Sequence, residues 1–310
     1  MNLKSNIAEY IETERQNALK LSGDGWARLA IIQIGNDAAS ELYVRSKKKE
    51  ASKWMIGCDV YKIDDNGDPD EICKNVINLI YHLNHIIAVN GIIVQLPILL
   101  PKEHTQQILD AISPKKNVDG FAQTNDGEFT HFYPCTPLGI INFLKWNYSA
   151  AKNGIFYRRN VLVIGRGKTI GEPLIKMLLH EPYNQLTICA SYSDLLNVGL
   201  VNVNNDILSK ADIIISAVPV PEFIDPTCLK PSAIVIDAGI ANIGNNGNYV
   251  QVGNLSHNNL DPNEKYCIDY TPWTNGVGKL TVATLMSNVR KAYRIQNNIL
   301  NSLDVGSVEE

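Results

Sequence analysis

VLVIGRGKTIG, residues 161–171, is the stretch of this sequence that decides its fold class. Its four leading apolar residues predict a buried parallel strand, Gly165 and Gly167 predict a tight turn, and a helical pattern follows to Leu179. In this order the backbone of the turn can approach a pyrophosphate at the positive end of the helix. The glycine spacing is one residue longer than in the usual dinucleotide fingerprint, so a plain tight turn between strand and helix is the alternative.

The same segment contains Gly-Lys-Thr, which invites a phosphate-loop interpretation. That motif needs a further glycine five residues before Gly167, and Leu162 occupies the position. We therefore exclude a phosphate loop. The next predicted strand, residues 186–190, ends without a carboxylate that could bind a ribose diol, and together with Arg166 this favours NADP as the cofactor.

Strand-like and helical patterns alternate along the rest of the chain, which is typical of a parallel α/β sheet. The predicted strands cover residues 28–34, 58–63, 91–94, 161–164, 186–190, 212–216 and 233–237. Polar residues and glycine dilute the apolar pattern at residues 142–158, and we place a domain boundary there. The sequence thus predicts an α/β protein with two domains.

Tyr43 and Lys47 lie four residues apart in a predicted helix from about Ser40 to Trp54, so the ring and the ammonium share one face. A lysine that transfers protons near neutral pH must be shielded, because burial disfavours the charged form. The alternative is a solvated helix lysine beside a half-buried core aromatic.

Gln95 follows a predicted buried strand, residues 91–94, that Leu96 and Pro97 bring to an end. Its amide can hold and orient the amine of Lys47 by a hydrogen bond. Asp119 lies in a short turn before a glycine, where a carboxylate can accept two hydrogen bonds from an amino-substituted heterocycle. The alternatives are a loop amide that caps backbone groups and an ordinary turn aspartate. Together these segments favour a small-molecule active site at the carboxyl ends of strands.

Composition narrows the functional classes. With 310 residues, 45% of them hydrophobic, the chain is long enough for two domains, and its net charge of -4 argues against a nucleic-acid partner. Six scattered cysteines without a CxxC pair favour reduced thiols in a cytoplasmic protein and give a metal site no support. The charged N-terminal segment lacks a signal-peptide core, and we expect no membrane span.

Seven motifs, in the correct order between about residues 28 and 295, resemble those of the bifunctional methylenetetrahydrofolate dehydrogenase/cyclohydrolase family. They are Tyr43 to Lys47, Val94 to Pro97, Lys116 to Gly120, Pro134 to Pro137, Gly165 to Gly171, Val235 to Ile240 and Thr271 to Thr281. The resemblance implies a folate-binding catalytic domain of residues 1–145 plus 285–310 and an NAD(P)-binding Rossmann-like domain of residues 146–284, with the active-site cleft between them. It also implies a homodimer that acts in one-carbon metabolism.

The implied reactions are oxidation of 5,10-methylenetetrahydrofolate with NADP and hydrolysis of the methenyl product to 10-formyltetrahydrofolate. In this family pattern Lys47 is the proton shuttle, Gln95 orients it, Tyr43 stacks on the folate and Asp119 binds the pterin edge. The implied substrate-binding residues are Tyr43, Gln95, Leu96, Asp119, Gly276, Val277 and Gly278. The implied cofactor-binding residues are Thr136, Gly165, Arg166, Gly167, Gly171, Ser191 and Ile240.

The chain departs from the family pattern in its cofactor and folate loops. Gly167 replaces a serine, Ala190 and Tyr192 replace a histidine and a basic residue beside Ser191, and the loop from Trp273 to Lys279 is altered. NAD use, or a variant in which hydrolysis dominates, therefore stays open. A two-domain NAD(P) dehydrogenase of a non-folate acid and a catalytically silent folate-binding relative are the alternatives from other classes.

Overall fold

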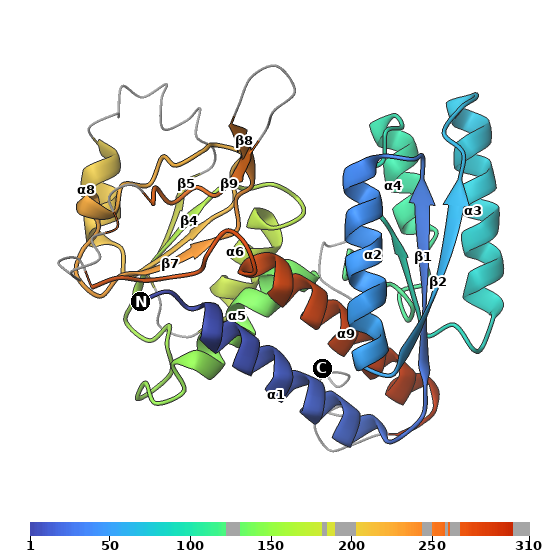
Figure 1. The fold of residues 1–310 in the computed structure, drawn as a ribbon, viewed down its shortest axis with the longest axis horizontal. Coiled ribbons are helices and arrows are strands. Elements are labelled where there is room, and N and C mark those ends of the chain that lie inside the picture. Colours follow the sequence, from blue (N-terminus) through green and yellow to red (C-terminus); the bar gives the residue numbers. More distant parts are fainter. Residues whose placement is uncertain are drawn as a thin grey trace. The chain divides into compact units, whose positions relative to one another are not determined.

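The computed structural model describes residues 1–121, 131–181, 185–189, 203–243, 250–257, 260 and 267–299 (Figure 1). Its contacts divide the chain into two compact units. The β1–β3 unit contains Glu12–Cys135 and the residues from Val282 onward, and the β4–β7 unit contains Met1–Ile11 and Thr136–Thr281. Two helices, α1 (Lys4–Ser22) and α9 (Val277–Gln296), contribute residues to both units.

The β1–β3 unit is built on a three-stranded parallel sheet in the order β2-β1-β3. The strands are β1 (Ala27–Ile34), β2 (Ile56–Ile63) and β3 (Gly91–Val94), and the helices are α2 (Ala38–Lys53), α3 (Pro69–His85) and α4 (Lys102–Asp110). On one face of the sheet, Ala30, Ile32, Ile92 and Val94 pack with apolar residues of α3 and α4. Because side chains alternate along a strand, the residues between them face the opposite side.

Local signals explain where these helices begin and end. Asp37 caps α2, because its Oδ2 accepts a hydrogen bond from the backbone N of Ser40 at 2.8 Å. Pro69 stands in the first turn of α3, where its missing N–H costs nothing. At the other end of α3, the buried ammonium of Lys116 donates to the carbonyls of Leu83 at 3.1 Å and Ile86 at 2.7 Å.

The β4–β7 unit is built on a five-stranded parallel sheet in the order β10-β7-β6-β4-β5. The strands are β4 (Asn160–Ile164), β5 (Gln185–Cys189), β6 (Ile213–Ser216), β7 (Ile234–Asp237) and β10 (Asp269–Tyr270). The helices are α5 (Cys135–Asn147), α6 (Gly171–Leu179), α8 (Val203–Lys210) and the short η2 (Pro226–Cys228), and β8 (Ala241–Ile243) pairs with β9 (Val250–Val252) as an antiparallel ribbon.

Apolar residues cover both faces of this sheet. Val161, Val163, Ile213 and Ile215 pack on the side of α5 and α6, and the alternate residues of the same strands pack with α8. The sheet order changes direction at β4, since β5 lies on one side of it and β6 on the other. Such a switch point places a crevice outside the carboxyl ends of β4 and β6, where α/β sheets bind ligands.

The predicted α/β fold with two units is confirmed, and the ends of β1 to β7 lie within two residues of the predicted ones, whereas β8, β9 and β10 were not predicted. The division into units falls after Cys135, the first residue of α5, whereas the sequence predicted a boundary at residues 142–158. The reason is that Ile140, Ile141 and Leu144 of α5 pack on β4 and β6, so the polar stretch marks a loop within the β4–β7 unit. Within the described ranges, no helix is both long and apolar enough to span a membrane.

Candidate active site

Lys47 and Gln95 meet at the carboxyl end of β3. The Lys47 Nζ donates to the Gln95 Oε1 at 2.9 Å, and the Gln95 Nε2 donates to the Leu96 carbonyl at 2.6 Å. The second bond orients the amide, because the nitrogen is held by a carbonyl and the oxygen is left to face the lysine. Gln95 is only 7% exposed, whereas Lys47 is partly buried. An oriented, sheltered amine suits proton transfer to a bound ligand.

The Asp119 carboxyl interacts electrostatically with the ammonium of the same lysine. The turn that carries it is held by Gly120, whose φ is +82° and whose added Cβ would stand 2.2 Å from the Tyr133 backbone, so a larger residue does not fit. Burial raises the pKa of the Asp119 carboxyl, while the Lys47 charge and a hydrogen bond with Cys135 act to lower it. A carboxylate placed here can pair with an N–H-rich ligand.

Cys135 and Asn288 lie beside the turn that carries Asp119, and the sequence analysis did not assign either of them to the site. The Asn288 Nδ2 donates to the Val118 carbonyl at 2.9 Å and contacts the Cys135 Sγ at 3.6 Å. Burial and the neighbouring Asp119 charge raise the pKa of the Cys135 thiol well above its ordinary value, so it stays protonated. Cys135 lies in a recognised motif and could have been found, but Asn288 is one polar residue on a helix and carries no local signal.

Tyr43 lies one helical turn before Lys47, and its side chain is 46% exposed. Its neighbour Val44 is buried and anchors the helix, so the ring is left available to a ligand. Leu96, next to Gln95, is partly buried. The roles of Tyr43 and Leu96 in substrate binding stay predictions.

The glycine turn after β4 lies at the switch point of the larger sheet. Gly165 has a φ of +105°, and a Cβ on it would stand 2.7 Å from the Ala217 carbonyl, which follows β6. A Cβ on Gly171 would stand 2.1 Å from the Gly165 carbonyl, so α6 packs directly against the turn. Gly167 has open space around its Cβ position, and Arg166 is exposed beside it. An open turn at a helix N-terminus fits a dinucleotide pyrophosphate.

The loops after β6 and β7 are fixed by Asn254, a fully buried residue that sequence reasoning missed. Its Nδ2 donates to the carbonyls of Val218 at 2.8 Å and Val220 at 2.6 Å, and its Oδ1 accepts from the Ser216 Oγ at 2.7 Å. Asp237 extends the network, because its carboxylate accepts from the Leu255 backbone N at 2.9 Å.

The Asp237 carboxylate also accepts from the Gly239 backbone N at 3.2 Å. Burial raises the pKa of Asp237, although its backbone donors act to lower it. The hydrogen bond from Gly239 fixes the loop that presents Ile240, whose side chain is 52% exposed at this edge.

Thr136 and the predicted folate loop lie elsewhere in the β4–β7 unit. The hydroxyls of Thr136 and Thr281 are 2.9 Å apart, at the starts of α5 and α9.

The predicted folate loop contains Gly276, Val277 and Gly278. A Cβ on Gly276 would stand 1.9 Å from the Pro272 carbonyl, so the loop needs a glycine there. The Val277 side chain is buried in the core, which leaves only its backbone for a ligand. Gly278 has open space at its Cβ position. The last predicted cofactor residue, Ser191, lies outside the described residues.

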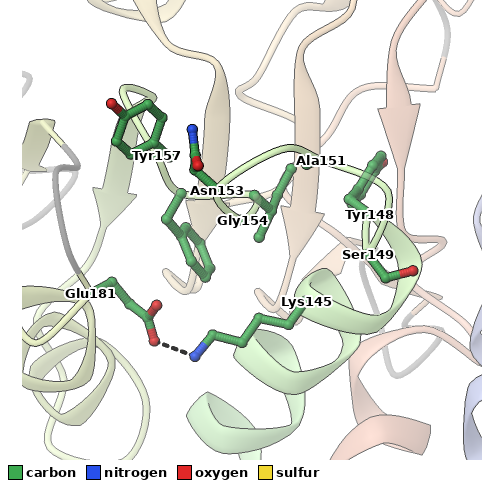
Figure 2. Close-up of a pocket in the computed structure, with 10 residues that line it drawn as sticks. Lys145, Tyr148, Ser149, Ala151, Asn153, Gly154, Tyr157 and Glu181 are labelled. Atoms are coloured by element: carbon green, nitrogen blue, oxygen red, sulfur yellow. Dashed lines mark ion pairs between the residues drawn. The ribbon is translucent and has the colours of Figure 1, made fainter.

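A separate cavity of about 300 Å³ lies near the loop between α5 and β4 (Figure 2). Tyr148, Tyr157 and an ion pair of Lys145 with Glu181, 2.5 Å apart, contribute to its lining. Because this loop precedes β4, the cavity is at the amino ends of the strands, away from the edge that carries Gly165. It is therefore not the nucleotide site.

Known proteins match both halves of the chain. The family model "Tetrahydrofolate dehydrogenase/cyclohydrolase, catalytic domain" matches residues 2–119, and "Tetrahydrofolate dehydrogenase/cyclohydrolase, NAD(P)-binding domain" matches residues 134–297.

Full-length relatives agree with the family models. The bifunctional protein FolD of Acetivibrio thermocellus is 34% identical over 300 residues, covering 95% of each chain. That of Chlamydia felis is 35% identical over 275 residues, covering 86% of this chain and 89% of the relative. The crystal structure of the bifunctional 5,10-methylenetetrahydrofolate dehydrogenase/cyclohydrolase from Thermoplasma acidophilum is 26% identical, with a TM-score of 0.75 over 96% of this chain and 99% of that one. The chain therefore belongs to the tetrahydrofolate dehydrogenase/cyclohydrolase family.

Proposed function

We propose that Lys47 moves protons in the hydrolytic half of the two reactions of this family. The first reaction oxidises 5,10-methylenetetrahydrofolate to the methenyl compound, and the second hydrolyses that compound to 10-formyltetrahydrofolate. The observation that supports the proposal is the 2.9 Å bond from the Lys47 Nζ to the oriented Gln95 Oε1, in the field of Asp119. The two reactions place different demands on these residues.

Hydrolysis needs a group that both accepts and returns a proton. Water adds to the carbon between the two folate nitrogens, and one proton of that water passes to the neutral Lys47 amine. The bond from the carbon to one nitrogen then breaks, and that nitrogen takes up the proton that Lys47 holds. The hydroxyl of the adduct loses its own proton to solvent and becomes the formyl carbonyl. Gln95 holds the amine in place through both transfers, since its own nitrogen is tied to the Leu96 carbonyl.

Substrate binding in this proposal rests on Asp119 and Tyr43. The Asp119 carboxylate accepts hydrogen bonds from the amino-substituted edge of the pterin, and the exposed Tyr43 ring stacks on the folate. Gly276 and Gly278 bring the backbone close to the ligand. Burial of Asp119 makes its pairing strong, because few competing waters surround it.

The dehydrogenase half uses a nicotinamide dinucleotide, which accepts a hydride from the bridging carbon when it is bound. Loss of the hydride makes that carbon a cation that its two neighbouring nitrogens stabilise, so the residues around it need only hold the reactants in contact. The glycine turn from Gly165 to Gly171 would hold the pyrophosphate, with Thr136, Ser191 and Ile240 as further contacts. We propose NADP as the preferred form, because Arg166 is an exposed cation in the turn. The preference is modest, since Gly167 offers no hydroxyl to support it.

This proposal assigns the catalytic residues for the folate to the β1–β3 unit and the dinucleotide to the β4–β7 unit. It also takes the protein to be a cytoplasmic homodimer, as its family resemblance implies. Sedimentation equilibrium at micromolar concentration should give twice the mass of one chain. A single-chain mass over the whole concentration range contradicts the dimer.

One assay tests the function directly. Purified protein is given 5,10-methylenetetrahydrofolate with NADP or NAD in parallel, and methenyl formation and its hydrolysis are followed by absorbance. We expect both reactions, with NADP the better oxidant. Turnover of a 2-hydroxy acid with no folate oxidation favours a dehydrogenase of non-folate acids instead, and folate binding without turnover favours a silent relative.

A further inference from the structure

Gln33, near the carboxyl end of β1, has a buried side-chain amide whose nitrogen is hydrogen-bonded and whose oxygen is not. Its side chain is 1% exposed, and its Nε2 donates to the Gly35 carbonyl at 3.2 Å. Within the part of the chain that the structure describes, its Oε1 has no hydrogen-bond partner. A buried acceptor without a donor is unfavourable, and in native proteins such an atom calls for an explanation.

The register of the sheet places Gln33 beside Gln95. Ile32 pairs with Val94 across the β1–β3 ladder, and the Gln95 backbone N continues this ladder by donating to the Ile32 carbonyl at 2.8 Å. Ile32 and Val94 both face α3 and α4, so the next residue of each strand faces the opposite side. Gln33 and Gln95 are therefore neighbours on the same face of the sheet.

Lys47 reaches over this face. Its ammonium bonds to Gln95, directly after β3. Because Gln33 and Gln95 share one face of the sheet, the ammonium lies on the face that carries Gln33. A lysine ammonium has three protons to donate, and the bond to Gln95 uses one of them.

We propose that Gln33 is a positioning residue whose Oε1 accepts a second hydrogen bond from Lys47 when the lysine carries its proton during hydrolysis. Two amides, one on each of two neighbouring strands, then stabilise the ammonium that forms after water attacks. This inference rests on the proposed role of Lys47 and adds a residue to it. It also explains why an amide oxygen is buried at the end of β1.

Other titratable groups lie near Lys47 and also affect the pH dependence of hydrolysis, so they must stay unchanged in a test of Gln33. Asp119 and Cys135 lie in its field on one side, and Cys58 of β2 lies in the field of both Lys47 and Lys48. Burial raises the pKa of Cys58 to about 11, so it stays a neutral thiol. Asp65 stands against Gly35, the residue that holds the Gln33 amide nitrogen. Changing Gln33 leaves all of these groups in place.

The test is the pH–rate profile of methenyl hydrolysis for two nearly isosteric variants. Gln33→Met removes the acceptor, so the ammonium is less stabilised and the acid limb of the profile should move to lower pH. Gln33→Glu places a carboxylate beside the ammonium, so the limb should move to higher pH. We expect each shift to be at least about half a pH unit, because neighbouring charge and hydrogen bonding shift titrations by this amount or more.

If Gln33 has only a structural role, both variants should lower the hydrolysis rate, and the acid limbs of their pH–rate profiles should not move in opposite directions. Gln107→Glu on α4, on the other face of the sheet, makes the same change of charge and should leave the profile unchanged. If Gln33→Met does not fold, as judged by folate oxidation, Gln33→Asn replaces it. This variant keeps the amide but withdraws it by one methylene and should also shift the limb to lower pH.

The outcomes separate this inference from the proposed function. If Lys47→Met keeps its hydrolysis, the role of Lys47 fails and the inference about Gln33 fails with it. If Lys47→Met is inactive but the Gln33 profiles coincide with that of the unchanged protein, or shift in one common direction, only the inference about Gln33 is overturned. Opposite shifts support it.

Discussion

At the scale of single residues, side-chain amides in this protein orient the groups that lie beside them. Gln95 is tied to the Leu96 carbonyl and turns its oxygen to Lys47, and Asn288 is tied to the Val118 carbonyl beside Cys135. A charged group held this way loses little entropy when it acts. Three substitutions test the assignments made at this scale.

Lys47→Met should abolish methenyl hydrolysis while folate still binds. Methionine keeps the length of the side chain but cannot carry a proton, and general acid–base groups contribute about a hundredfold or more. Stopped-flow absorbance of the methenyl compound measures the rate, and isothermal titration measures folate binding. Lys48→Met, a change at the exposed neighbouring position, is the control and should keep its hydrolysis. More than about a tenth of the normal rate in Lys47→Met would rule out the proton shuttle.

Asp119→Ala should weaken folate binding by roughly tenfold to a hundredfold, since a buried charge-assisted hydrogen bond contributes about 1.5–3 kcal/mol. Cofactor binding should change little. Titration of each ligand separately checks this. An equal loss for both ligands would indicate that the variant is misfolded and that the pterin assignment has no support.

Arg166→Ala should remove the preference for NADP and leave NAD-dependent oxidation nearly intact, because a guanidinium pairs with the ribose phosphate that only NADP carries. The ratio of kcat/KM for the two cofactors is the measurement. Lys168→Ala, at another exposed position of the same turn, should keep the preference. The idea fails if the unchanged protein prefers NAD, or if the variant keeps its full NADP preference.

At the scale of elements, the carboxylate of Asp212 links the amino ends of β4 and β6 through hydrogen bonds and ion pairs. Asp212, directly before β6, accepts from the Asn160 backbone N at 2.8 Å and pairs with Lys230 and Arg159. Burial acts to raise the pKa of Asp212, but the bonds from Lys230 and Asn160 outweigh it and the net pKa is lowered. The carboxylate thus clamps β4 and β6 at their amino ends.

Asp212→Asn should lower the free energy of unfolding by about 1–3 kcal/mol at neutral pH, because a charge-assisted network is lost. A group whose folded pKa is depressed stabilises the fold above its unfolded pKa, and this contribution disappears as pH falls through the folded pKa. The difference between variant and unchanged protein should therefore shrink as the pH falls below the ordinary pKa of aspartate, because the folded pKa of Asp212 is lowered from it. Urea unfolding at several pH values measures it, and a penalty independent of pH contradicts the ionic clamp.

At the scale of the whole molecule, the residues proposed for hydrolysis lie in one unit and the turn proposed for the cofactor lies in the other. Lys47, Gln95 and Asp119 all lie in the β1–β3 unit, and the glycine turn with its supporting Asn254 network lies in the β4–β7 unit. Hydrolysis needs no nicotinamide, so a change confined to the glycine turn should affect oxidation alone.

Gly171→Ala tests this division. The new Cβ would stand 2.1 Å from the Gly165 carbonyl, so α6 must move away from the turn. We expect kcat/KM for the cofactor to fall by roughly tenfold or more, while methenyl hydrolysis keeps its rate. Gly57→Ala, in the other unit, is a control for oxidation, because the new Cβ would meet its nearest neighbour, the Ala27 carbonyl, only at 3.8 Å. Parallel loss of both reactions in Gly171→Ala contradicts the division.

The local sequence was sufficient for the elements and for most of the chemistry. Apolar runs of the right length predicted β1 to β7, because burial on two faces requires such runs, but they did not predict the two-residue β10. The i and i+4 spacing placed Tyr43 and Lys47 on one helix face, and the strand end at Val94 placed Gln95 beside a ligand edge. These inferences depend only on neighbours in the chain.

Only the tertiary structure decided which distant residues complete the sites. Gln33, Asn254 and Asn288 are ordinary polar residues in the sequence, and their roles come from strand register and helix packing between segments far apart in the chain. The border between the units was decided in the same way, by the apolar face of α5 on β4 and β6. A hydrogen bond across such distances has no local pattern, because its partners are chosen by the packed fold and not by the residues beside them in sequence.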